Sequence, residues 1–176
     1  MNFPQRKYPR AKWHDYDGAT YFVTVCTKNM AHYLGSVQNG IMTMSKTGLF
    51  LDKTLADVSL HHDYARVPEW VVMPNHFHAL VIINHIAPSY LHSRITGSSD
   101  LKRSPVVTGE KRGMLSVVIG GIKASVTRHA NLCTTQFAWQ KRFHDHIVRN
   151  QDEYFRIVDY IRHNPERWAE DCYHTY

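Results

Sequence analysis

The sequence has few cysteines, few acidic residues and no long hydrophobic run. Its cysteines, Cys26, Cys133 and Cys172, lie far apart and form no CxxC pair, so we expect a reducing cytoplasm and no zinc–thiolate site. No stretch of about 18 apolar residues occurs, which argues against a transmembrane helix. The first residues, MNFPQRK, contain no apolar core, so no signal peptide is expected.

The deficit of acidic residues leaves a basic chain. There are 21 lysines and arginines against 15 acidic residues, which gives a formal charge of +6. This balance favours a polyanionic partner such as nucleic acid. With 176 residues, 43% of them hydrophobic, the chain fits a single domain over residues 1–176. We expect a basic, aromatic-containing arm at 1–19 and a mobile loop at 84–112, where no periodic pattern occurs.

The hydrophobic pattern predicts a mixed fold. Alternation favours strands, apolar residues at helical spacing favour helices, and a short Pro-Asn connection makes the second and third strands an antiparallel pair. The expected elements are strands at 21–27, 70–73 and 76–83, an extended segment at 137–149, and helices at 45–60, 115–126 and 151–163. This order is the split βαβ arrangement: an α+β, ferredoxin-like fold with an antiparallel sheet and an extra C-terminal helix.

The strand expected at 76–83 opens with His76-Phe77-His78. Because side chains alternate along a strand, both histidines face the same side and Phe77 faces the other. Two adjacent neutral imidazoles form a pair of metal ligands. They are equally compatible with two half-buried histidines that have only structural partners. A second His-X-His at 144–146 is a weaker ligand candidate.

The last helix combines an apolar stripe with polar residues outside it. Asn150 is placed to cap its start, with Glu153 as the partner of a capping box. Tyr160 and Asn164 lie one turn apart on a polar face, away from the core. They offer a phenol and a carboxamide for chemistry, although a surface tyrosine and a capping asparagine would look the same. The stripe itself consists of Tyr154, Ile157, Val158 and Ile161.

These motifs together resemble one protein family. Pro74-Asn75-His76-Phe77-His78-Ala79-Leu80-Val81 is similar to the HUH signature (His, bulky hydrophobe, His) of single-strand DNA nucleases. The segments 139–150 and 160–165 resemble the REP-associated tyrosine transposases within that group. The similarity runs from about Tyr21 to Trp168. Histidine-triad nucleotide hydrolases fit poorly, because Leu80 stands where they need a third histidine.

The resemblance implies a function and a site. His76 and His78 would bind Mg²⁺ or Mn²⁺, Asn164 would be a third ligand, and Tyr160 would attack a phosphodiester to give a 5′-phosphotyrosine. The substrate would be single-stranded DNA with a hairpin, bound by a monomer or homodimer. The alternative is a domesticated hairpin-binding protein that no longer cleaves. Candidate DNA contacts are Arg6, Lys7, Arg10, Lys12, Trp13, Lys123, Arg128, Trp139, Lys141, Arg142 and Arg149.

Overall fold

A four-stranded antiparallel sheet forms the centre of the fold. The computed structural model describes residues 19–84, 113–133 and 136–174. The sheet has the order β4-β5-β1-β6 and every neighbouring pair is antiparallel. Each outer strand is reached by a helical crossover, through α1 from β1 to β4 and through α4 from β5 to β6, which is the split βαβ topology. The prediction of an α+β, ferredoxin-like fold is therefore confirmed. The strands are β1 (Thr20–Cys26), β4 (Ala65–Val72), β5 (His76–Ile83) and β6 (His144–Ile147).

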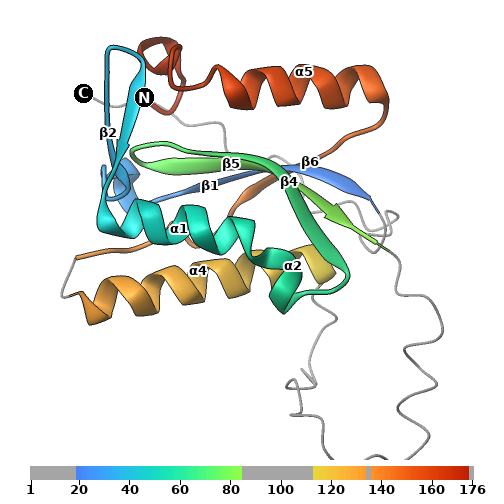
Figure 1. Ribbon diagram of the computed structural model, residues 1–176, viewed down its shortest axis with the longest axis horizontal. Coiled ribbons are helices and arrows are strands. Elements are labelled where there is room, and N and C mark those ends of the chain that lie inside the picture. The colour runs from blue at the N-terminus through green and yellow to red at the C-terminus, as the bar shows by residue number, and fades with distance from the viewer. Residues whose placement is uncertain (1–18, 85–112, 134–135, 175–176) are drawn as a thin grey trace, which may run out of the picture.

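Helices cover both faces of this sheet (Figure 1). On one face α1 (Lys46–Ala56), α2 (Val58–His61) and α4 (Met114–Leu132) enclose the main hydrophobic core. On the other face α5 (Gln151–Arg162) packs through a smaller cluster centred on Leu80, Val158 and Ile161. Strand β5 is buried along nearly its whole length because it is central and covered from both sides. This explains why its sequence is an almost continuous apolar run.

A β-hairpin, β2 (Gly35–Gln38) with β3 (Ile41–Met44), was missed by the sequence analysis. Its turn is Asn39-Gly40, and both residues have positive φ, 51° and 75°. Asn-Gly with two positive φ angles is the sequence signature of a type I′ hairpin turn. The hairpin follows the short helix η1 (Lys28–Met30). In Figure 1 it lies beside the C-terminal segment, by which we mean residues 165–174.

Several expected boundaries differ from the structure, and the helix expected at 115–126 extends to Leu132. The helix expected at 45–60 is divided into α1 and α2 at Asp57. The strand expected at 70–73 begins earlier, at Ala65, and its register with β5 shifts between Arg66 and Glu69. Pro68 lies in that interval, and an edge strand tolerates a proline at such an irregularity. The extended segment at 137–149 is regular only at β6, with one isolated bridge between Thr27 and Trp139.

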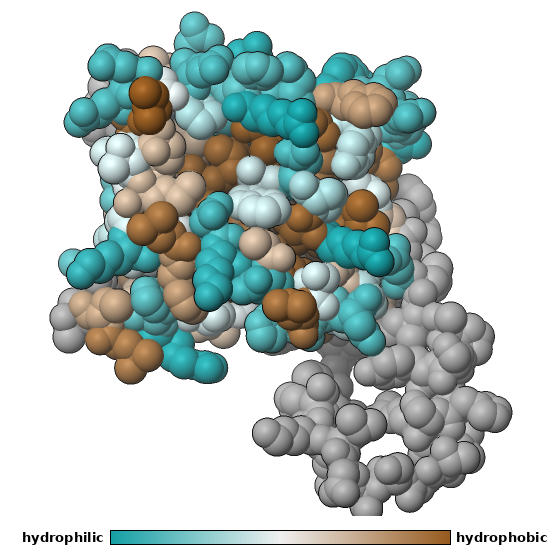
Figure 2. All heavy atoms as spheres, viewed as in Figure 1, coloured by the Kyte–Doolittle hydropathy of each residue, from teal (hydrophilic) through white to brown (hydrophobic). Residues whose placement is uncertain are grey.

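The start of α5 confirms the predicted cap. The Asn150 side chain accepts a hydrogen bond from the Glu153 backbone N–H at 2.9 Å. In a capping box the glutamate side chain would in turn accept from the backbone N–H of the cap residue, Asn150. Here the Glu153 side chain accepts instead from the N–H of the preceding residue, Arg149, at 2.7 Å. In Figure 2 hydrophilic side chains lie along the upper margin and hydrophobic ones show beneath it. The cap and the apolar stripe thus fix where α5 begins and which side faces the sheet.

Most of the predicted arm (1–19) and loop (84–112) lie outside the described residues. Among the helices that the structure describes, none is both long enough and apolar enough to cross a membrane.

Candidate active site

Strand β5 places both signature histidines on the sheet face beneath α5. His76 and His78 are 0% and 1% exposed, so they are fully rather than half buried. They lie opposite Cys26 and Thr24 of β1, and their Nε2 atoms are 3.0 Å apart. Two ligands at right angles around one ion, each at about 2.1 Å, are also about 3.0 Å apart. The strand therefore holds two nitrogen donors at a separation that suits a single cation.

Neighbouring hydrogen bonds determine which nitrogen of His76 is free. The Asn75 side-chain N–H₂ donates to the Tyr173 carbonyl at 2.8 Å, which turns the Asn75 Oδ1 toward His76. That oxygen is 2.8 Å from His76 Nδ1, so Nδ1 must carry the proton that it accepts. Nε2 of His76 then presents a lone pair to the site. A second partner that fixes the tautomer in this way is typical of metal-binding histidines.

His78 contacts a threonine on one side and the candidate nucleophile on the other. Its Nδ1 is 2.8 Å from Thr24 Oγ1, and its Nε2 is 3.2 Å from the Tyr160 hydroxyl. Burial lowers the pKa of His78 to about 3. Burial, with a further contribution from His78, also lowers the pKa of His76 well below its usual value. Both imidazoles are therefore neutral at physiological pH, the form that binds a metal.

Tyr160 reaches this pair from α5. The helix is fastened to the sheet by its apolar cluster and by an ion pair between Arg162 and Glu69 of β4. The Tyr160 ring meets the rings of Phe22 and His78 edge-on, with centroids 5.9 Å and 5.2 Å away. Burial and the Asp171 carboxylate raise the pKa of Tyr160 to about 12, against a smaller lowering by a side-chain hydrogen bond from Asn164. Its phenol is therefore protonated unless a positive charge comes close.

One expectation about this helix is wrong. Tyr160 and Asn164 do not lie on an open polar face: Tyr160 is half-buried and Asn164 is 2% exposed. The sequence analysis assumed that the side of the helix opposite the apolar stripe is exposed to solvent. In the structure the chain turns back after α5, and Trp168, in the short helix η2 (Trp168–Glu170), is buried. The C-terminal segment thereby covers the end of α5 and encloses both residues.

This C-terminal segment adds two residues that the sequence analysis did not identify. Asp171 Oδ2 lies 3.9 Å from His76 Nε2, and the Tyr173 ring lies 4.8 Å from that of His76 between centroids. The ligand atoms of His76, His78 and Asp171 lie within 4.8 Å of one another. Two buried oxygens in the described chain, Asn164 Oδ1 and Asp171 Oδ2, have no hydrogen-bond partner. Two imidazoles with unpartnered oxygens nearby fit a divalent cation.

No sequence pattern predicts that Asp171 or Tyr173 belongs to the site. They follow the last helix in a stretch with no periodicity, and they reach the histidines only because the chain reverses direction. Thr24 alternates with apolar residues in β1, so its contact with His78 follows only from the pairing of β1 with β5. Asn75 directly precedes His76, and this adjacency was the one sequence signal for any of these additional site residues.

The candidate DNA contacts are not gathered at this site. Arg6, Lys7, Arg10, Lys12 and Trp13 lie outside the described residues. Of those that the structure describes, Lys123, Arg128, Trp139 and Lys141 line one hollow beside α4, and Arg142 and Arg149 do not. Arg128, Lys141, Arg142 and Arg149 are exposed. Their contact with DNA stays a prediction.

Lys123 and Trp139 are engaged in the protein itself. The Lys123 ammonium donates to the Gln140 carbonyl at 2.6 Å, and the Trp139 indole N–H donates to the Lys123 carbonyl at 3.2 Å. The Trp139 ring also packs edge-on against Phe77 and Phe137. Both residues line a shallow hollow beside α4, on the face of the sheet opposite α5. They join α4 to the segment before β6.

The comparisons agree with this fold. No family model matches the sequence. An uncharacterized protein of Haemophilus influenzae is 28% identical over 172 residues, covering 94% of this chain and 91% of that protein. A REP-associated tyrosine transposase, solved bound to a REP hairpin, matches with a TM-score of 0.53 and 22% identity, over 94% of this chain and 73% of its own. The resemblance to REP-associated tyrosine transposases is therefore confirmed at the level of the fold.

Proposed function

We propose that this protein is a metal-dependent endonuclease and strand transferase for single-stranded DNA, a transposase that acts at hairpin-forming repeats. The basic composition, a formal charge of +6, suits a nucleic-acid substrate. The solved structure with the same fold holds a REP hairpin. These observations support the substrate class, and the site geometry supports the reaction.

One observation carries the proposal. The Tyr160 hydroxyl lies 3.2 Å from Nε2 of His78, and that nitrogen lies 3.0 Å from Nε2 of His76. A nucleophile and a neutral ligand pair therefore meet within a single chain. A tyrosine needed only for packing has no reason to direct its hydroxyl at a buried imidazole pair. This geometry also favours a tyrosine that acts in its own chain rather than in a partner's site.

The reaction follows from these groups. The Tyr160 oxygen forms a bond to phosphorus while the bond from phosphorus to the 3′ oxygen breaks, which leaves a 5′-phosphotyrosine and a free 3′-hydroxyl. Attack by another 3′-hydroxyl on the phosphotyrosine reverses the exchange and joins two strands. Phe22, His78 and Asn164 hold the phenol in place. The number of phosphodiester bonds is unchanged, so no external energy source is needed.

His76 and His78 would hold the metal, together with oxygen donors from the residues around them. When bound, a divalent ion supplies positive charge to the scissile phosphate and to the phenol oxygen. Imidazole ligands favour Mn²⁺ over Mg²⁺. The hydrogen bond that His76 donates to Asn75 Oδ1 and the one between His78 and Thr24 keep both rings oriented, which limits the reorganisation that metal binding requires.

The test is a covalent-adduct assay. Labelled single-stranded hairpin DNA is incubated with the full chain and Mn²⁺ or Mg²⁺, then separated under denaturing conditions. We expect an adduct that is lost in Tyr160→Phe and in His78→Ala. Tyr154→Phe is the matched control, because Tyr154 is on the same helix but packs in the apolar cluster. Loss of the adduct in Tyr160→Phe but not in Tyr154→Phe assigns the nucleophile.

Two other outcomes would change the assignment. Tight hairpin binding without an adduct, for any repeat or metal, would favour the domesticated, non-cleaving alternative. An adduct that survives Tyr160→Phe would move the nucleophile elsewhere. The next tyrosine to replace is then Tyr173, whose ring lies against both histidines.

A further inference from the structure

The C-terminal segment is fixed against the histidine pair by several independent contacts. The Trp168 ring lies 6.0 Å from the His76 ring and 5.9 Å from the His32 ring, between centroids. The Tyr173 carbonyl accepts from Asn75 at 2.8 Å. Asp171 ends the short helix between these two anchors. Its position beside His76 is therefore part of the fold.

Only one of the two carboxylate oxygens of Asp171 has a hydrogen-bond partner in the described part of the chain. Its side chain is 3% exposed, and one oxygen, Oδ1, accepts from the Tyr173 N–H at 2.8 Å. The other oxygen, Oδ2, is buried without a hydrogen-bond partner. Leaving a buried carboxylate oxygen unpaired is unfavourable in a low-dielectric site. A cation that binds there removes this cost.

The His76 ring offers the Asp171 carboxylate no hydrogen bond. The ring proton of neutral His76 is at Nδ1, directed at the Asn75 side-chain oxygen 2.8 Å away. The nitrogen that faces Asp171 therefore carries a lone pair, as does the carboxylate oxygen 3.9 Å away. Two acceptors that face each other repel. His78 Nε2 is the third potential ligand atom of the group.

We propose that Asp171 is a direct ligand of the divalent metal, so that the ion is held by two imidazoles from β5 and one carboxylate from the C-terminal segment. The inference rests on the metal-dependent function proposed above, and it adds a ligand that the resemblance does not supply. Neighbouring donors around one octahedral ion are about 3.0 Å apart and opposite donors about 4.2 Å. The 3.9 Å between Asp171 and His76 lies between these values.

This ligand set has two consequences. A carboxylate lowers the net charge of the site and adds a hard oxygen donor, a combination that suits Mn²⁺. It also links the ion to residues that follow α5, so metal binding fastens the C-terminal segment to the sheet. Metal should then slow hydrogen exchange at the backbone amides of Cys172 and Tyr173, which measures the link without any DNA.

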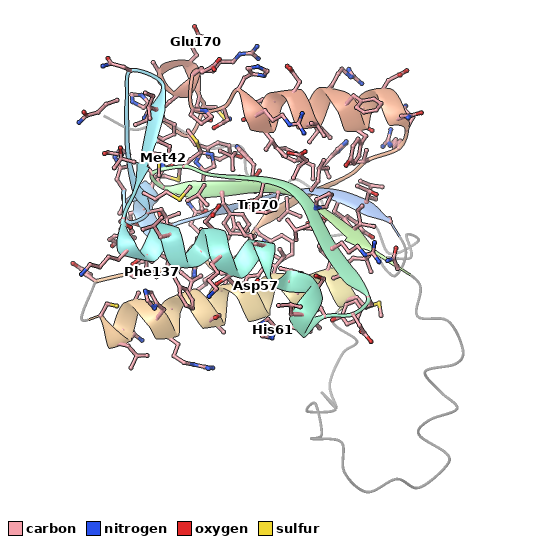
Figure 3. The ribbon with its side chains drawn as sticks, in the orientation of Figure 1. Met42, Asp57, His61, Trp70, Phe137 and Glu170 are labelled. Carbon is pink, nitrogen blue, oxygen red and sulfur yellow. The ribbon has the colours of Figure 1, made fainter. Side chains whose placement is uncertain are left out.

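The test compares Mn²⁺ binding by calorimetry in the full-length protein. Asp171→Asn keeps the shape and the oxygen that Tyr173 bonds but removes the charge. Glu170→Gln is the matched control: it removes the same charge one residue away, from a side chain that is exposed and points away from the sheet (Figure 3). Altering outer partners of a metal site weakens affinity about 10- to 100-fold. We expect at least that loss for Asp171→Asn and no change for Glu170→Gln.

Thermal unfolding in EDTA separates a ligand from a structural residue. A ligand carboxylate is uncompensated without metal, so the melting temperature of metal-free Asp171→Asn should equal or exceed that of the wild type. Weaker Mn²⁺ binding together with a lower metal-free melting temperature would assign Asp171 a structural role and overturn the inference.

Two calorimetric results distinguish this inference from the proposed function. Wild-type affinity in Asp171→Asn, with affinity lost in His76→Ala, would remove Asp171 from the ligand set and leave the proposed function standing. Absence of Mn²⁺ binding by the wild type would overturn both.

Discussion

Burying two neutral histidines makes the metal-free protein sensitive to acid. His78 has its pKa lowered to about 3 in the folded chain by burial, whereas an unfolded histidine titrates near 6.5. Below pH 6.5 the unfolded state therefore binds a proton that the folded state does not. The associated stability is complete above pH 6.5 and decreases as the pH falls toward 3.

The size of this effect follows from the shift. Each pH unit between the two pKa values removes about 1.4 kcal/mol, so His78 alone costs about 2 kcal/mol between pH 7.5 and pH 5.0. The pKa of His76 is lowered in the same direction and adds to the loss. Domains of this size are stable by about 5–15 kcal/mol. A large share of the stability should therefore disappear over a pH range in which carboxylates are still charged.

Urea unfolding followed by tryptophan fluorescence, in EDTA at pH 5.0 to 7.5, measures this loss. The His78→Asn variant isolates one histidine, because any cost of the substitution that does not depend on pH cancels from the slope. We expect the difference in unfolding free energy between wild type and variant to change by about 1.4 kcal/mol per pH unit below 6.5. His144→Asn controls for the removal of a histidine from an exposed edge strand. A difference for His78→Asn that is constant with pH would refute the reasoning.

Other predictions concern the elements around the site. Asn150→Ala removes the cap of α5 and should cost about 1 kcal/mol of stability in urea unfolding. Gly40→Ala should cost about 1 kcal/mol or more in the same assay, because Gly40 has a φ of +75° and an added Cβ would lie 3.3 Å from the Glu166 backbone. Trp139→Ala should lower stability, by less than the about 3–5 kcal/mol typical of a fully buried tryptophan, because the ring packs on Phe77 but is only partly buried. A Trp139→Ala protein of unchanged stability with weakened hairpin binding would instead support base stacking.

The sequence predicted those parts of the fold that depend on local periodicity. The alternation in β1 and the apolar stripe of α5 identified both elements, and the Asn150 cap placed the start of α5. The β2–β3 hairpin was missed although Asn39-Gly40 is a strong turn signal. Pro68 shows a different limit of local patterns. Strand β4 contains this proline and forms nevertheless, because it pairs with β5 on either side of an irregularity.

The site was predictable only where it lies within a motif. His76 and His78 are two residues apart on one strand, so alternation alone places them together. Asp171 reaches them by a reversal of the chain after α5, which no local pattern encodes. Trp139 shows the opposite limit, a residue whose pattern fits two roles. In a sequence, an aromatic residue near basic ones looks the same whether it stacks on a nucleic-acid base or packs in the protein core.

Strand β5 combines a face of the hydrophobic core with the candidate metal site. Phe77 and Ala79 point into the main core, while His76 and His78 point to the opposite face, where their neighbours are polar groups and a phenol. Because side chains alternate, a polar group can be added to one face without leaving a cavity in the other. The apolar face holds the strand rigid, and this rigidity keeps the two Nε2 atoms 3.0 Å apart. A flexible loop would let two neutral imidazoles separate, so the strand that stabilises the fold also sets the spacing that a cation needs.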